Sequence, residues 1–222
     1  MVYWLDFVTL SPPGFYGKDI AIDVVSALVV LLIGFFCFKN FLLDKRSKKQ
    51  LLLSSAFLVL AASFLVKIAT NVLTHSESAP TLYHQYLAAG FLAHLFLTLF
   101  GFYILYALTS KDDLTMNYVI MAYFILILAY FARFNYHWFH VTAVIFLLAS
   151  TRRYVLAYKE HKYKNTKLLA ISFSIITLSQ VFFTFTYTDR WVYVAAEAIQ
   201  LLGYCFLLYT FIMVLKNARK KK

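Results

Sequence analysis

Apolar residues gather in seven long runs along the chain, and short polar connections separate them. The runs are roughly Asp19–Asn40, Leu51–Thr74, Tyr86–Thr109, Tyr118–Ala132, Tyr136–Val155, Leu168–Tyr187 and Trp191–Leu215. About 20 apolar residues in a helix span the hydrocarbon core of a bilayer, and most of the runs have this length. The fourth run is several residues short. The pattern predicts an all-α membrane protein, a polytopic bundle of seven transmembrane helices.

This pattern divides the chain into three parts. We expect an interfacial N-terminal segment over residues 1–18, the helix bundle over 19–215 and a basic tail over 216–222. The first segment lacks the basic start of a cleavable signal peptide. Its aromatic residues indicate a position at the membrane interface, although folding over the mouth of the bundle as a cap is an alternative. They are Trp4, Phe7, Phe15 and Tyr16.

Charge indicates how the bundle is threaded. The chain has 62% hydrophobic and only 14% charged residues, with a formal net charge of +11. Most of the 21 lysines and arginines lie in the first, third and fifth connections and in the tail. By the positive-inside rule, this places the N-terminus outside and the C-terminus in the cytoplasm of a multi-pass cell-membrane protein. The basic rim would face anionic lipid headgroups, and nucleic-acid binding is not expected.

Polar residues recur at similar depth in five of the predicted helices. The predicted polar layer comprises Asp23, Lys67, Asn71, His94, Gln180, Glu197 and Gln200. An ionisable group in hydrocarbon costs about 2.5–3.5 kcal/mol on insertion scales, so such groups face inward and form pairs. Helices 1, 2 and 7 are neighbours in a sequential ring, which makes Asp23, Lys67 and Glu197 candidates for one ion cluster with a formal charge of −1. His94 is a candidate further donor.

Three interpretations of this layer remain open. In the first, the layer is a structural ion pair that binds no ligand. In the second, it lines a cavity that is open to the outer face and receives a small polar ligand or a proton. In the third, the residues do not share one depth, and Lys67 alone extends its side chain to the interface. No charged path continues into the inner half, where serines, Thr98 and Tyr204 satisfy their own helix backbones. A cavity that opens only outward favours a receptor over a channel or pump.

The scarcity of helix breakers argues against a transporter. The chain has three prolines, and none lies inside an apolar run. Transporters commonly bind their ions at broken helices, which proline or glycine interrupts. Bulky aromatic side chains should therefore dominate the helix contacts, with Ala89–Gly90 and Ala93 as the one plausible close approach.

Four histidines near the outer face offer a possible metal site. His137 and His140 are three residues apart at the start of helix 5, and His75 and His84 lie in the connection between helices 2 and 3. Imidazole pairs at helical spacing bind zinc or copper. The spans lack the three-ligand pattern of an intramembrane zinc hydrolase. Helix 7 also lacks the lysine to which retinal photoreceptors attach their chromophore. We therefore expect no cofactor and no catalytic constellation.

In topology, short connections and basic rim, the chain resembles the seven-helix membrane-associated sensor modules of prokaryotic signalling proteins, and seven-span prokaryotic membrane proteins of the same shape. The resemblance implies a receptor that feeds a cytoplasmic output domain. We expect no such domain after the bundle and instead a separate cytoplasmic partner that docks on the Arg152–Lys167 connection or the tail. The alternatives are a membrane enzyme or metal-binding protein that uses the outer histidines, and a small proton-coupled transporter.

Overall fold

The computed structural model is all-α. It describes residues 12–15, 17–43, 48–75, 80–108, 114–132, 137–186 and 188–219. The described part holds a 3-10 helix, η1 (Pro13–Phe15), and the α-helices α1 (Lys18–Leu43), α2 (Lys48–His75), α3 (Pro80–Ala107), α4 (Leu114–Ala132), α5 (His137–His161), α6 (Lys164–Thr184) and α7 (Arg190–Arg219). Each predicted apolar run corresponds to one of these α-helices. The helical, membrane-type fold expected from the sequence is therefore confirmed.

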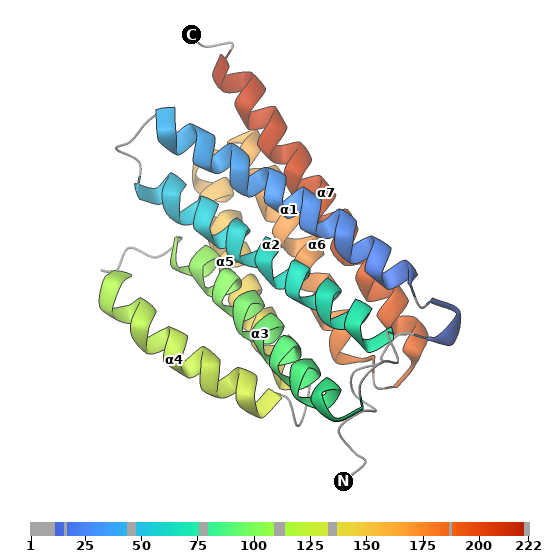
Figure 1. Cartoon of the computed structure of the whole chain (residues 1–222). Helices are drawn as coiled ribbons and strands as arrows, with labels where there is room; N and C mark the ends of the chain where they lie inside the picture. Colours follow the sequence, from blue (N-terminus) through green and yellow to red (C-terminus); the bar gives the residue numbers. More distant parts are fainter. Residues whose placement is uncertain are drawn as a thin grey trace.

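Six of the α-helices form a ring, and the seventh lies outside it. Around the ring, α1 packs on α2, α2 on α3, α3 on α5, α5 on α6, α6 on α7 and α7 on α1. Helix α4 packs against α3 and α5 from outside, at the edge of the bundle (Figure 1). The described residues contain six helices long and apolar enough to cross a membrane, and α4 contributes only a shorter apolar stretch, Met121–Ala132. The run predicted as the weakest span is thus also the peripheral helix.

Helix α1 shows how each ring helix divides its two faces. Its buried side chains recur in alternate steps of four and three residues, as they do in packed helices. Asp19, Asp23, Ser26, Val30, Ile33 and Cys37 follow this spacing, and Ala27 and Val29 beside them are buried too. The opposite face exposes large apolar side chains such as Leu28, Leu32 and Phe35. A helix that is apolar on its exposed face as well is typical of a membrane span.

The two ends of the bundle differ in charge. We call one the basic end, because its described lysines lie where α1, α5 and α7 end and where α2 and α6 begin. They are Lys39, Lys48, Lys49, Lys159, Lys162, Lys164, Lys167 and Lys216. We call the opposite end, where α1 starts beside η1, the capped end. Lys45, Arg46, Lys111 and Lys220–Lys222, which were also expected on the basic side, lie outside the described residues.

Aromatic side chains fill the ring between the two ends. Phe64 and Tyr204 meet edge to face with ring centroids 5.6 Å apart, and Phe57 and Phe211 do the same at 5.8 Å. Both contacts join α2 to α7 across the interior. Edge-to-face pairs contribute about 0.5–1.5 kcal/mol beyond their buried area. The expected bulky interdigitation is confirmed.

Glycines allow more close approaches than the sequence suggested. A Cβ on Gly90 would collide with Thr70 of α2, which agrees with the approach predicted at Ala89–Gly90. A Cβ on Gly101 would lie 2.6 Å from Leu60 Cγ, and one on Gly203 would lie 2.7 Å from Ile176 Cγ1. The prediction of one close approach was therefore wrong, because a lone glycine gives no signal until its neighbouring helix is known.

A serine also joins two helices where its own backbone was expected to satisfy it. Ser54 Oγ donates to the carbonyl oxygen of Gly34 in α1 at 2.9 Å. In contrast, Ser150 and Ser172 bond to carbonyls one turn earlier in their own helices, as predicted. Gly34 lies close to Leu58 of α2, and this approach of the two helices brings the Gly34 carbonyl within reach of Ser54.

Candidate functional site

Three ionisable side chains from three helices meet inside the ring. Lys67 Nζ of α2 donates to Asp23 Oδ1 of α1 at 2.8 Å and to Glu197 Oε1 of α7 at 2.7 Å. Asp23 and Glu197 are completely buried, and the Lys67 side chain is 17% exposed. The predicted convergence of these residues is confirmed. We call Asp23, Lys67 and Glu197 the ion cluster.

The ion cluster contains more acid than base. One ammonium and two carboxylates leave a formal charge of −1. The second oxygens, Asp23 Oδ2 and Glu197 Oε2, are buried, and neither has a hydrogen-bond partner among the described residues. Buried carboxylate oxygens normally have such partners, because leaving them unsatisfied costs about 1–3 kcal/mol or more. The formal charge of −1 and the two unsatisfied oxygens would therefore allow the cluster to bind a proton or a small cation.

A third carboxylate lies one turn away and was missed at the sequence level. Asp19 is 5% exposed and four residues before Asp23, on the same face of α1. The spacing of four is visible in the sequence, but Asp19 stands at the first position of the predicted apolar run, where a charged residue usually marks the boundary of a span. Its position increases the negative charge between the ion cluster and the capped end.

An apolar group covers the ion cluster on the side of the capped end. Lys67 Nζ lies 6.0 Å from the centroid of the Tyr193 ring. Tyr193 packs with Phe183 and Ala196, and Phe15 of η1 contacts this group. The only described aromatic of the N-terminal segment therefore packs on the bundle, which favours the cap over the interfacial anchor for this residue. Trp4, Phe7 and Tyr16 lie outside the described residues.

His94 is held by α2 rather than by the acids. Its Nδ1 lies 2.8 Å from Ser63 Oγ, one turn from Lys67 toward the basic end. Ser63 also donates to the His94 carbonyl oxygen and bonds to Thr98. A serine beside an imidazole is the geometry of a nucleophile and its base. Ser63 is only 1% exposed and shares its hydroxyl among three groups, so the arrangement crosslinks α2 and α3.

His140 and Gln180 form a second polar pair. His140 Nδ1 lies 2.8 Å from Gln180 Oε1, and the imidazole stacks on Phe183 with ring centroids 4.9 Å apart. Both side chains are 2% exposed. The sequence placed His140 in a predicted metal site on the outer rim and Gln180 in the polar layer at the depth of Lys67. The structure corrects the first placement: His140 is buried and bonds through Nδ1 to Gln180, because α5 and α6 are neighbours.

The remaining members of the predicted layer flank the ion cluster. Asn71 is half-buried one turn from Lys67 toward the capped end, and Gln200 is buried one turn from Glu197 toward the basic end. Phe139 lies between the two buried imidazoles, 6.1 Å from the ring of His94 and 4.8 Å from that of His140. The layer is thus distributed over all six ring helices.

The described residues do not assemble the predicted metal site. Among them, no group of three or more histidine, cysteine, aspartate or glutamate side chains is placed to hold a metal ion. His140 is used by Gln180, and His137 is half-buried at the start of α5. The side chains of His75 and His84 lie outside the described part of the chain.

The pairing of His140 with Gln180 makes a direct prediction. Gln180→Leu should lower the free energy of unfolding by about 1–2 kcal/mol, because it removes the oxygen that accepts a hydrogen bond from the buried imidazole. Adding His140→Phe should recover most of this loss, since the apolar pair needs no hydrogen bond. Equilibrium unfolding in mixed micelles measures both effects. Equal losses in the single variant and in the double variant would contradict the pairing.

Comparison with known proteins finds no match to a family model, to a curated protein or to a solved structure. The function is therefore argued from the site itself.

Proposed function

We propose that the chain is a membrane sensor of receptor type whose stimulus is a proton or a small cationic ligand bound at the ion cluster. In this proposal all seven helices span the cell membrane, the capped end faces outward and the basic end faces the cytoplasm. A polar cavity that includes Asn71, His94, Gln180 and Gln200 surrounds the cluster. Output passes to a separate cytoplasmic partner.

One observation carries the proposal: a net negative cluster in which Lys67 bridges two completely buried acids, each with an unsatisfied oxygen. A proton or small cation on either acid would neutralise the formal charge. It would also weaken that acid's attraction to the ammonium. Because the acids stand on α1 and α7 and the ammonium on α2, binding would change how these three helices hold together.

The packing toward the basic end supports a sensor over a channel or transporter. Between the ion cluster and that end, the ring interior contains the Phe64–Tyr204 and Phe57–Phe211 contacts. The polar side chains described there, such as Ser63, Thr98 and Tyr204, are uncharged, and an ion without a counter-charge in such an interior is strongly disfavoured. A change in helix packing would then transmit the effect of binding to the cytoplasmic side of the bundle.

The basic end suits the proposed output. Arg152, Lys159, Lys162 and Lys167 are exposed on and around the α5–α6 connection. Such a surface would adjoin anionic headgroups and present a docking face to an acidic partner. A shift of α1 against α7 would move this rim.

The binding step can be tested by infrared difference spectroscopy of the full chain in lipid nanodiscs, on changing pH or adding sodium chloride. We expect a carboxyl signal that changes with protonation or with sodium. It should disappear in Asp23→Asn combined with Glu197→Gln. Asp189→Asn is the control, because this carboxylate is exposed at the start of α7, away from the cluster. A signal unchanged by the double substitution would refute the site.

A sensor requires a conformational change in addition to binding. Spin labels at Lys39→Cys and Lys216→Cys, in a background without Cys37 and Cys205, report the α1–α7 distance at the basic end. We expect this distance to change under the conditions that alter the carboxyl signal. A constant distance together with steady proton or sodium flux into liposomes would overturn the sensor in favour of a transporter.

A further inference from the structure

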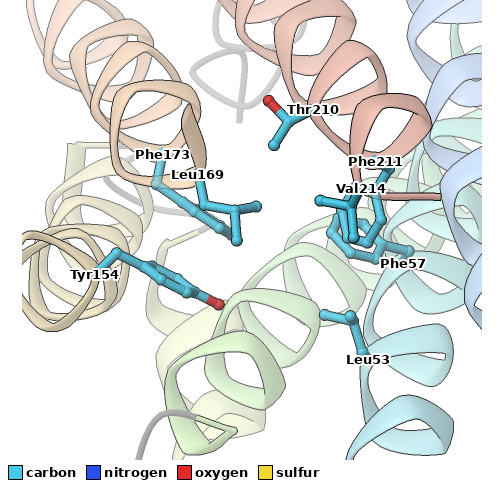
Figure 2. A pocket seen from close by; sticks show the side chains of 8 residues that line it. All are labelled: Leu53, Phe57, Tyr154, Leu169, Phe173, Thr210, Phe211 and Val214. Carbon is cyan, nitrogen blue, oxygen red and sulfur yellow. The ribbon is translucent and has the colours of Figure 1, made fainter. Parts of the chain in front are cut away.

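A separate cavity lies in the ring near the basic end. It has a volume of about 120 Å³, and four helices line it. The lining residues are Leu53, Phe57, Tyr154, Leu169, Phe173, Thr210, Phe211 and Val214. Figure 2 shows these side chains surrounding one space, with the Tyr154 hydroxyl pointing toward it. Tyr154 is fixed by stacking on Phe173, with ring centroids 5.1 Å apart.

The volume and the lining residues of the cavity determine which ligands it can hold. An apolar cavity of about 150 Å³ in another protein stays dry and binds benzene or xenon. This cavity is therefore large enough for a short hydrocarbon segment. Thr210 uses its hydroxyl on the carbonyl of Phe206, which leaves its methyl group and six hydrocarbon side chains as lining, with the tyrosine hydroxyl as the remaining polar group.

The cavity is reached most directly from the basic end. Leu53, Leu169 and Val214 each stand five residues from the end of their helix, which is about 8 Å along the axis. Gln50 lies one turn from Leu53 in the direction of that end. Its Oε1 is buried and has no hydrogen-bond partner among the described residues. A buried polar atom without a partner among the described residues thus lies one turn from a lining residue, toward the basic end.

Lysines stand near the same end of the cavity. Lys49, Lys167 and Lys216 are exposed, and each lies within four residues of a lining residue on its own helix. Among the described residues at this end, the acidic side chain is that of Glu160. An apolar interior below a basic rim is complementary to a molecule with an apolar chain and an anionic head.

From this complementarity we infer that the cavity binds a single-chain anionic amphiphile, with its hydrocarbon end among Phe57, Phe173 and Phe211 and its anionic head at the lysines. A single chain fits better than a two-chain phospholipid, because the lining comes from the interior of the ring and not from its lipid-facing surface. This site is separate from the ion cluster, and its test does not depend on the proposed function.

The test uses a medium-chain carboxylate that carries a photoreactive diazirine at its methyl end, added to the full chain in nanodiscs. Cross-linked peptides are identified by mass spectrometry. We expect labelling at Phe173 and Phe211, reduced about tenfold by Leu169→Trp, which fills the cavity. Leu156→Trp is the matched control: it makes the same change on the exposed face of α5, beside Tyr154, and should leave labelling unchanged. Val214→Phe repeats the filling if Leu169→Trp does not fold.

A second comparison tests the head group. Lys49→Gln, Lys167→Gln and Lys216→Gln together should reduce labelling by the carboxylate about tenfold, because the anionic head loses the positive charges near this end of the cavity. The corresponding uncharged diazirine alcohol should label the same peptides weakly in both proteins. Equal labelling by the acid and the alcohol would contradict recognition of an anion. Labelling that survives both filling variants would contradict binding in the cavity, and so would label confined to lipid-facing residues.

Discussion

Lys67→Met should be among the most destabilising single substitutions in the bundle, with a loss of about 3–5 kcal/mol in the free energy of unfolding. The substitution removes the ammonium from two completely buried carboxylates at 2.7 and 2.8 Å. Combining it with Glu197→Gln should recover part of the loss, and adding Asp23→Asn should recover more, because neutral side chains no longer require a cation. Equilibrium unfolding in mixed micelles gives the three values.

Leu65→Met is the control for this series, since Leu65 lies two residues away on the exposed face of α2. It should change stability by less than about 0.5 kcal/mol. If the losses from Lys67→Met and Glu197→Gln simply add, the two residues do not stabilise one another. That result would remove the basis of the proposed site.

Gly203→Ala should destabilise the bundle by about 1–3 kcal/mol, although alanine favours a helix more than glycine does. The added Cβ would lie 2.7 Å from Ile176 Cγ1 and 3.2 Å from the Ile176 backbone nitrogen. Ile176 is 1% exposed, so its side chain has little room to move, and the backbone of α6 has less. The same unfolding measurement tests this expectation.

Gly34→Ala makes the same change where the neighbour can adjust. Its Cβ would lie 3.1 Å from Leu58 Cδ2, and Leu58 is 41% exposed. We expect a change within about 1 kcal/mol, in either direction. If Gly203→Ala were as well tolerated as Gly34→Ala, the close packing of α6 against α7 would not limit stability.

Much of the fold was readable because the bilayer imposes simple rules. The length of each apolar run and the alternation of basic connections led to seven helices, whose ends lie within six residues of those observed. The ion cluster was predictable for a related reason. A lone lysine such as Lys67 is too costly to leave in hydrocarbon, and the acids Asp23 and Glu197 stood at matching depth on helices expected to be neighbours.

The predictions that failed concern the direction in which a side chain or a helix face points around the helix axis. The sequence gives the depth of His140 but not the helix that its ring faces, so its pairing with Gln180 went unseen. Helix α4 lies outside the ring because α3 packs directly on α5, a contact that connection lengths do not reveal. The glycine contacts at Gly101 and Gly203 were missed for the same reason.

By itself, the sequence determined that this protein is a helical membrane bundle and that its few interior charges must meet. Both conclusions follow from the free energy of transferring a side chain from water to hydrocarbon, which each residue carries with it. Only the tertiary structure decided that the ring has six members, that Phe15 packs beside Tyr193, and that an apolar cavity lies below the basic rim. These features depend on how distant side chains fit together in space, and hydropathy contains no record of that fit.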